Sequence, residues 1–579
     1  MNKFATFAFA LILPDLLATL YAAPLSGDRS ALQRVDAGRL TLTSENTVAR
    51  QVRSIVIKPD VFGNVIPDFS MAGYCNGGAS LPIAPVAFTV GPGEGDDDTE
   101  RIQAAIDQVE KLVSRSADGV RGAVLLAKGT YHCNRPLRVG PGVTLRGEGQ
   151  DPGGTTVIAT MIPPDGQMPT LIQVTGNGVI SAEAKPHEIL DETVPLGAMK
   201  LHVVRAAELK PGDEVIIERR ATQNWIHDLK MDVINLHPGG VQWKAEDYCL
   251  KWSCRIADIN GDVATLDTPV ICSIEQRYGG GEVCKAVDQR GRGASVENLR
   301  LESVYQKGKE GADERHAWTA ILISGIVDSW VRNVTAVHFA YSCVQVDKNA
   351  SRITVQDCAM IDPVSEITGG RRYSFVGGGQ FVLFQRCYAR NGRHDFVTGQ
   401  LDVGPTVFLD CLAEHTHSDI GPHHRWSCGQ LYDNVRGGQI NVQDRGGMGT
   451  GHGWAGNCQV LWNCEAKTFI CEKPWIISAQ NWAVGCVGQK GSPALAGRPE
   501  GFWESYGQHV APRSLYLSQL AARIAQAGGN PDQAIRAVTI PEQRKGVIWG
   551  LLHERYQNEK LTDATVLSTA RKVDGKEKL

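Results

Sequence analysis

One ten-residue pattern recurs through the second half of the chain, first as WVRNVTAVHF (330–339) and RITVQDCAMI (352–361). Each copy begins with a segment that alternates as a strand does. This segment ends at a polar residue, which is usually followed by cysteine and then by a small residue. Further copies are FVLFQRCYAR (381–390), TVFLDCLAEH (406–415), QINVQDRGGM (439–448), VLWNCEAKTF (460–469) and WAVGCVGQKG (482–491). Repeats of roughly 20–50 residues indicate a solenoid, and the lack of a helical segment in each repeat favours a β-solenoid.

The cysteines of this pattern are expected to form a column inside the solenoid. Equivalent residues of successive coils stack about 4.8 Å apart, the spacing of neighbouring strands. Because free cysteine packs well as a small buried hydrophobe, most of these residues are predicted to be reduced thiols. The column is predicted to run through Val334, Cys358, Cys387, Cys411, Asp444, Cys464 and Cys486.

The first coil is predicted to begin with a helix in GDDDTERIQAAIDQVEKLV (95–113). Asp97 can cap this helix, and Glu100 lies three positions further on, as a capping box requires. The spacing places the apolar side chains on one face. These side chains are Ile102, Ile106, Val109 and Val113. Two apolar stretches with strand character follow, GAVLLAKGTYHC (122–133) and PLRVGPGVTLRGEG (136–149).

This order of helix, AVLLAKGTY and GVTLRGEG resembles the opening of pectate-lyase-superfamily proteins, with Ala127–Tyr131 in place of their Pro-x-Gly-x-Tyr. Residues 95–491 resemble that superfamily as a whole. The stretches RHDF, GPHHRWSCGQLYDN, GHGWAGN and WNC look like bacterial β-helix proteins described only as pectate-lyase-like. The resemblance implies an all-β, right-handed parallel β-helix. It also implies that a polysaccharide binds along one sheet, with lyase or hydrolase chemistry.

The chain is divided into an exported leader, a solenoid with one insertion, and a terminal cap. MNKFATFAFALILPDLLATLYAAP has one lysine before an apolar run and small residues after it, which predicts a signal peptide and a secreted, periplasmic or extracellular protein. The predicted segments are a signal peptide (1–23), an N-terminal extension (24–95), the first coils with their capping helix (96–195), a β-rich insertion (196–275), the main β-helix with the active site (276–491), and C-terminal capping helices with a tail (492–579).

The net charge of −4 and the sequence pI of about 6.4 exclude a global basic field. No attraction to nucleic acid or to an anionic membrane is therefore expected. Beyond the leader, no stretch approaches the roughly 18 apolar residues that span a bilayer, so no membrane contact is expected once the signal is removed. The sequence leaves the oligomeric state open.

Residues 371–452 concentrate the groups that could do chemistry. This window holds six of the 15 histidines, and it holds eight arginines but no lysine. Arginine binds a carboxylate through two parallel hydrogen bonds, whereas lysine is a mobile point charge. Histidine titrates near neutrality. This combination fits removal of a proton next to a carboxylate, and it predicts an acidic polysaccharide as the partner.

The repeat register predicts that these residues share one edge of the solenoid. Arg393 and His394 follow Cys387 by six and seven residues, as His417 follows Cys411 by six. A long loop (417–434) and a glycine-rich loop (444–457) are expected beside them. The predicted catalytic residues are Arg393, His394, His417, His424, Arg425, Tyr432 and Arg445. The predicted substrate-binding residues are Arg371, Arg372, His415, His423, Trp426, Asn434, His452 and Trp454.

The predicted reaction is β-elimination in a uronate-containing polysaccharide. Arg393, Arg425 or Arg445 would hold the carboxylate, and neutral His417 or His424 would remove the C5 proton. Tyr432 or a second histidine would protonate the departing oxygen.

Three alternatives stay open. His415-x-His417-x-Asp419 could bind zinc or manganese, and related lyases use calcium, although the sequence itself requires no cofactor. A glycoside hydrolase needs two placed carboxylates, for which Asp395, Asp419, Asp433 and Asp444 are candidates. A non-catalytic adhesin or binding module is the third alternative. The tryptophans of the insertion, Trp225, Trp243 and Trp252, could form either its core or a sugar-stacking wall.

Overall fold

The computed structural model describes residues 58–114, 116–164 and 166–559, together with the backbone of 566–567. The predicted signal peptide (1–23) and the first part of the predicted extension lie outside the described residues. Among the described residues, no helix has the length and apolar character needed to cross a membrane.

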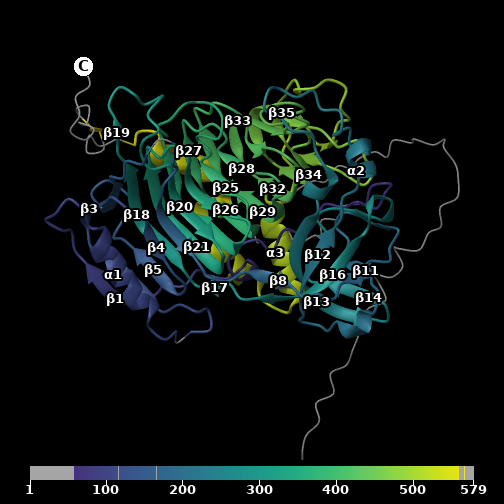
Figure 1. The fold of residues 1–579 in the computed structure, drawn as a ribbon, viewed down its shortest axis with the longest axis horizontal. Helices are drawn as coiled ribbons and strands as arrows, with labels where there is room; N and C mark the ends of the chain where they lie inside the picture. Colours follow the sequence, from purple (N-terminus) through teal and green to yellow (C-terminus); the bar gives the residue numbers. More distant parts are fainter. Residues whose placement is uncertain (1–57, 115, 165, 560–565, 568–579) are drawn as a thin grey trace, which may run out of the picture. The chain divides into compact units, whose positions relative to one another are not determined.

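The chain winds through three rows of parallel strands, as Figure 1 shows, and each strand pairs with the equivalent strand one coil further on. The expected right-handed parallel β-helix is confirmed. Row 1 consists of β4 (Leu137–Val139), β7 (Thr170–Thr175), β20 (Thr319–Ser324), β22 (Ser342–Val346), β25 (Phe375–Gly377), β28 (Phe396–Thr398) and β31 (Gly421–Pro422).

Rows 2 and 3 form one continuous sheet, because the long strands β18 (Ser295–Ser303) and β21 (Ile326–Val337) run through both rows. Row 2 also contains β1 (Val86–Val90), β2 (Gly122–Leu126), β5 (Val143–Arg146), β23 (Ser351–Gln356), β26 (Gln380–Gln385), β29 (Val403–Leu409), β32 (Ser427–Asp433), β34 (Gly456–Trp462), β36 (Trp482–Val484) and β38 (Phe502–Glu504). Row 3 also contains β3 (Gly129–Cys133), β6 (Thr155–Ala159), β24 (Ala359–Ile361), β27 (Tyr388–Arg390), β30 (Leu412–Glu414), β33 (Arg436–Val442), β35 (Glu465–Cys471) and β37 (Val487–Lys490).

A left-handed residue joins rows 2 and 3 in successive coils. Its φ lies between 50° and 56°, a region that asparagine and aspartate enter more easily than most residues. The residues are Asn298, Asn333, Asp357, Arg386, Asp410, Asn434 and Asn463. Arg386 is the exception in type, and it donates to both carboxylate oxygens of Asp357 at 2.7 and 2.8 Å. This turn residue is the polar residue that precedes cysteine in the repeats.

The column after this turn is buried and consists mainly of free thiols, as predicted. One member was wrong, because Val435 and not Asp444 is equivalent to Cys411 and Cys464. QINVQD (439–444) belongs largely to β33 in row 3, and the true repeat is SCGQLYDNV (427–435), in which valine replaces cysteine. Asp444 instead pairs with Arg498 at 2.8 Å.

Helix α1 (Thr99–Glu110) covers the start of the core with Ile102, Ile106 and Val109. Its N-cap is Asp98, one residue later than predicted, while the Asp97 carboxylate accepts from the Thr99 backbone N–H at 3.1 Å. The predicted fourth apolar contact is wrong: Val113 lies beyond the helix and is 83% exposed. The solenoid begins before α1, because β1 already pairs in parallel with β2.

The insertion is wider than the predicted 196–275, because its antiparallel sheet extends from residue 180 to residue 288. The sheet order is β11 (Lys200–His202), β14 (Val263–Leu266), β13 (Leu250–Asn260), β12 (Glu214–Arg219), β16 (Gly281–Asp288) and β8 (Ile180–Ala182), and the short helix α2 (Gln223–Asp228) lies beside it. Trp225, Trp243 and Trp252 are buried in the core of the insertion and expose at most 3% of their surface. These three residues are therefore core side chains and do not form a sugar-stacking wall.

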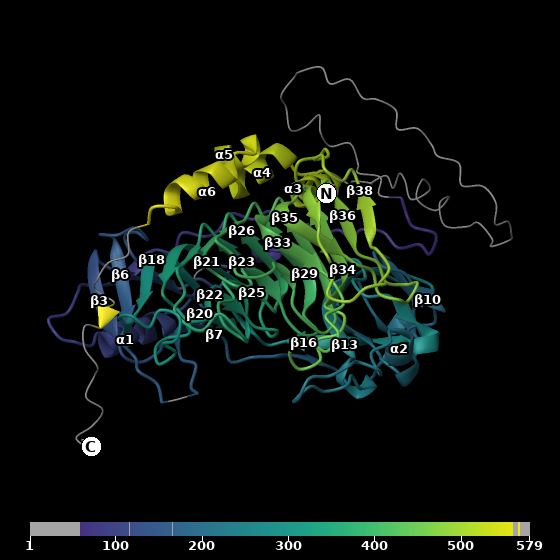
Figure 2. The ribbon, with the colours of Figure 1, turned by 90° about the horizontal axis from the view of Figure 1, so that it is seen from above.

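The C-terminal helices are predicted to cap the end of the solenoid. In the structure they lie along its side instead (Figure 2). They are α3 (Leu515–Gln526), α4 (Pro531–Val538), α5 (Pro541–Lys545) and α6 (Ile548–Tyr556). Outward side chains of rows 2 and 3 are apolar in this region and need cover. Leu520 packs in a cluster with Leu383 and Leu431, and Leu552 in a cluster with Leu412. The Ser514 side chain caps α3 by accepting from the Leu517 backbone N–H at 3.1 Å.

We expect all fifteen cysteines to react as thiols when the protein is unfolded without reductant, because each is free in the structure. Titration with a thiol reagent in denaturant measures the number directly. Folded protein should react slowly, since only Cys75 is exposed. A titre close to one thiol per chain would contradict the buried column.

Candidate active site

Five aromatic and imidazole rings gather where row 1 ends, beside the loop that joins β33 to β34. His394 and Tyr373 each precede a row 1 strand by two residues in neighbouring coils, with ring centroids 4.9 Å apart. His423 and His424 follow β31, and His452 comes from the 443–455 loop. His423 lies 4.3 Å from His394 and 4.9 Å from His452, and His424 lies 4.8 Å from His452. We call these five residues the histidine cluster.

Tyr373 is the member that sequence reasoning missed. Its hydroxyl lies 3.0 Å from Nε2 of His423, which makes a phenol–imidazole pair inside the cluster. Just before it in the stretch RRYSF (371–375), Arg371 and Arg372 are the predicted binding residues. The available signal was the equal spacing of Tyr373 and His394 from Phe375 and Phe396, two core residues that stack at 5.6 Å.

A buried ion pair supports the cluster from below. The His394 Nδ1 lies 2.7 Å from the backbone oxygen and 3.2 Å from the carboxylate of Asp419. The same carboxylate is paired with Arg445, and it accepts from Asn441 Nδ2 at 3.2 Å. Burial alone would raise the pKa of Asp419, but Arg445 and His394 outweigh it and hold this pKa well below its usual range. The pair fixes the His394 ring in place.

The four histidines are neutral at pH 7. Burial is the main cause, and it lowers the pKa of His394 and, much further, that of His423. It lowers the pKa of His424 to about 4, helped by Arg425, and that of His452 to about 3. One ring nitrogen of each histidine is buried without a partner among the described residues. A buried polar atom without a partner lowers the stability of the fold, so these four imidazoles call for an explanation other than stability. A neutral imidazole can accept a proton.

Three arginines predicted as catalytic surround the cluster. Arg393 is half-buried, with its guanidinium 5.8 Å from the centre of the Tyr373 ring. Arg425 donates to the carbonyl oxygen of Thr450 at 2.7 Å and to Gln400 at 3.0 Å, so it holds the loop that carries His452. Arg445 is committed to Asp419. Of the three, Arg393 has the most freedom to meet a ligand.

Two predicted substrate-binding arginines are occupied by the protein itself. Arg371 forms a bidentate ion pair with Glu314, with 2.8 Å between Nη2 and Oε2. Arg372 is buried and donates to the Ser365 carbonyl oxygen at 2.6 Å. Both guanidinium groups are thus engaged by other parts of the chain.

The predicted metal ligands are not brought together. His415 and His417 are exposed, and His415 takes a left-handed backbone conformation with φ 53°. Asp419 is buried under Arg445. In the described part of the chain, no group of three or more His, Cys, Asp or Glu side chains is arranged to hold a metal ion. His417 lies outside the histidine cluster, so His424 is the better placed of the two predicted bases.

Four further predicted site residues lie elsewhere. Tyr432 is in the solenoid core and stacks on Phe408 at 5.1 Å, where burial raises its pKa well above the usual value. Asn434 is one of the left-handed turn residues between rows 2 and 3. Trp426 and Trp454 are buried in the core shared with the insertion. All four side chains therefore serve the packing and the turns of the solenoid and the insertion.

The backbone is strained directly after His424. Arg425 and Trp426 both have positive φ, at 54° and 62°. A bulky side chain in this region is a genuine outlier and costs on the order of 1–3 kcal/mol. Trp426 is locked there by packing edge-on against Trp225 of the insertion, 4.9 Å away. The contact fixes the direction in which His424 and Arg425 leave the chain.

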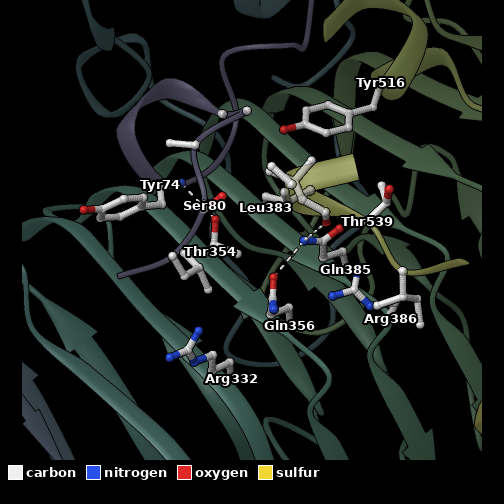
Figure 3. Close-up of a pocket in the computed structure, with 17 residues that line it drawn as sticks. Tyr74, Ser80, Arg332, Thr354, Gln356, Leu383, Gln385, Arg386, Tyr516 and Thr539 are labelled. Carbon is white, nitrogen blue, oxygen red and sulfur yellow. Dashed lines mark hydrogen bonds between the residues drawn. The ribbon is translucent and has the colours of Figure 1, made fainter. Parts of the chain in front are cut away.

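Away from the histidine cluster, a recess of about 180 Å³ lies on the outer face of row 2, between residues 74–81 and 537–540 (Figure 3). Its polar groups are paired with each other or with the backbone. Gln385 donates to Gln356 at 2.9 Å, and Thr354 accepts from the Tyr74 backbone N–H at 2.9 Å. Arg332 pairs with Glu297 at 2.9 Å. The recess therefore offers few free groups to a ligand, and it contains no histidine.

Several solved structures are similar to this chain at low sequence identity and with TM-scores below 0.5. A tailspike protein of Pseudomonas phage LKA1 is 13% identical with a TM-score of 0.42, over 67% of this chain and 56% of the tailspike. The A-module of an Azotobacter vinelandii mannuronan C-5 epimerase is 10% identical with a TM-score of 0.30, over 72% and 96%. An iota-carrageenase complexed to iota-carrageenan fragments is 9% identical with a TM-score of 0.27, over 70% and 58%. This chain thus spans little more than half of that tailspike. No protein-family model and no curated protein matches the sequence.

Replacing His424 by glutamine should reduce the amount by which the unfolding free energy falls in acid. The folded-state pKa of about 4 lies below the unfolded value of about 6.5, so only the unfolded chain takes up this proton between those pH values. Stability is complete above pH 6.5 and falls as the pH drops towards 4. In His424→Gln, the difference in unfolding free energy between pH 7 and pH 5 should shrink by about 1–2 kcal/mol.

Denaturant unfolding at the two pH values measures this difference. The matched control is His237→Gln, because His237 is exposed. An unchanged difference in His424→Gln would show that folding does not lower the pKa of this imidazole.

Proposed function

We propose that this protein is an exported polysaccharide lyase that cleaves a uronate-containing polymer by β-elimination. The observation that carries the proposal is the pair of Tyr373 and His423 within a group of four neutral histidines. A neutral imidazole can accept a proton, and a phenol can return one. The resemblance of residues 95–491 to the pectate-lyase superfamily supports the same class of substrate.

Each step of the elimination has a candidate group. His424 is only half-buried, and burial with the help of Arg425 keeps it neutral, so it is the proposed base for the C5 proton. The electron pair of the C5–H bond forms the C4–C5 double bond, and the C4–O bond breaks. Tyr373 is the proposed acid that protonates the departing oxygen. Arg393, beside Tyr373, is the proposed partner of the substrate carboxylate, which gains negative charge as the proton leaves.

This assignment needs no metal ion, because guanidinium and imidazole groups supply the neutralisation and the proton transfer. His423 and His394 are proposed to position Tyr373, since both rings contact it and His394 is fixed by Asp419. Three of the four carboxylates considered for a hydrolase, Asp419, Asp433 and Asp444, are already engaged. Asp433 accepts from the Tyr516 backbone N–H at the start of α3, and Asp444 pairs with Arg498. The fourth, Asp395, accepts from the Ser374 hydroxyl at 2.6 Å, while its other oxygen is buried without a partner among the described residues.

Incubation with a panel of uronic polymers tests the reaction class. Ultraviolet absorbance of the 4,5-unsaturated product should grow with time. New reducing ends without that absorbance would indicate a hydrolase. Binding without any cleavage across the panel would indicate an adhesin.

Tyr373→Phe should lower kcat by roughly 10²–10⁴-fold, the usual contribution of a placed proton donor. The change removes one hydroxyl and leaves the ring contacts with His394 and His423. Tyr506→Phe is the matched control, because Tyr506 is 43% exposed and bonds only to the backbone of Gly488. Activity of Tyr373→Phe within twofold of the parent would remove Tyr373 from the mechanism.

Activity should stay level from pH 7 to about pH 5 and fall below that. The base must be neutral, and burial with the help of Arg425 lowers the pKa of His424 to about 4. Initial rates across this range give the midpoint, and circular dichroism at each pH separates protonation from unfolding. A midpoint near 6.5 would instead assign the base to an exposed histidine.

A further inference from the structure

A small pocket of about 160 Å³ lies between the insertion and the solenoid. This volume is about that of five water molecules in liquid water, which is close to the size of one sugar ring. The insertion contributes most of its lining, and the solenoid contributes Gln400 and Arg425. The insertion residues are Val241, Gln242, Trp243, Asp247 and Tyr248.

This pocket adjoins the histidine cluster. Arg425 directly follows His424, and its Nη2 donates to the carbonyl oxygen of Thr450. The indole Nε1 of Trp243 donates to the Gly451 carbonyl oxygen at 3.1 Å, and the next residue is His452. The 449–453 loop therefore has the histidine cluster on one side and the pocket on the other. Two consecutive residues, His424 and Arg425, thus belong to the cluster and to the pocket.

The lining has the chemistry of a saccharide site. Trp243 and Tyr248 stack with 4.2 Å between ring centroids and 17° between planes. Each ring is only 3% exposed, so the pair forms a closed floor, and the groups that a sugar can reach above it are polar. Gln400 accepts from Arg425 through its amide oxygen, and this leaves its NH₂ group to donate. Asp247 is exposed at the rim and can accept hydrogen bonds from hydroxyl groups.

The charges disfavour a uronate in this pocket. The Arg425 side chain already donates to Gly451, Gln400 and Thr450, so it has little left for a carboxylate. The Asp247 carboxylate also repels the carboxylate of a uronate. By contrast, a carboxylate accepts from sugar hydroxyls through strong, charge-assisted hydrogen bonds.

We propose that this pocket is a subsite for one neutral pyranose unit of the polymer, adjacent to the uronate at the histidine cluster. The proposal rests on the proposed function in naming the second unit a uronate. It makes the substrate a mixed polymer in which uronate and neutral sugar are neighbours. The insertion is then a specificity element, because it supplies the floor and the acidic rim of the subsite.

Two variants and a matched control test the subsite. Asp247→Ala and Gln400→Ala remove free polar groups from the pocket. Glu246→Ala removes the neighbouring exposed carboxylate, which does not line the pocket. Losing a hydrogen bond to a charged group should raise KM about tenfold in Asp247→Ala, with kcat unchanged. Gln400→Ala should raise KM less, and Glu246→Ala should behave as the parent does.

Binding is measured separately in the Tyr373→Phe background by isothermal titration with oligosaccharides. The probes are hyaluronan and glucuronoxylan fragments, in which uronate neighbours a neutral sugar, and oligogalacturonates of equal length. The mixed fragments should bind more tightly, and Asp247→Ala should remove the preference. Equal binding by the three pocket and control variants, or no binding of any probe, would overturn the subsite.

The subsite and the proposed function can fail independently. Unsaturated product with unchanged KM in both pocket variants would leave the lyase and remove the subsite. Weaker binding in Asp247→Ala, without unsaturated product from any polymer, would leave the subsite on a protein that is not a lyase.

Discussion

A left-handed turn between rows 2 and 3 sets the register on which the rest of the molecule depends. In seven coils the same position, from Asn298 to Asn463, has φ near 53°. Cross-strand contacts such as Asn333 to Asn298 at 2.9 Å stabilise the stack. Because side chains alternate along a strand, a slip of one residue would reverse inside and outside in that coil. The turn therefore decides which residues form the core and which reach the surface.

The histidine cluster is a consequence of that register. Tyr373 and His394 meet because β25 and β28 pair with Phe375 opposite Phe396. Row 1 then ends at β31, so the next coils cross this region as loops, and His423, His424 and His452 fill the space. Burial keeps the imidazoles neutral, while the pair of Asp419 and Arg445 carries the local charge. The register of the coils thus sets the positions of these imidazoles and, through burial, their protonation states.

The insertion adds a wall that the solenoid lacks. Its tryptophans form a core with Trp426 and Trp454, and this core directs the strained backbone at residues 425–426. The same packing brings Trp243 and Tyr248 beside Arg425. A coil without such an insertion would leave the loop at 449–453 open on that side. The insertion therefore supports the cluster mechanically and shapes the space next to it.

The solenoid, the buried thiols and the region of the candidate site can be predicted from the amino-acid sequence. Strand alternation, the cysteine position and the density of histidine and arginine in 371–452 are local properties, and local properties can be read from one chain. The tertiary structure alone decided which of these residues meet. Tyr432 and Tyr373 look alike in sequence, yet one stacks on Phe408 in the core and the other contacts His423. The difference arises because the facing of a side chain depends on pairing with a neighbouring coil, and that pairing is fixed by residues distant along the chain.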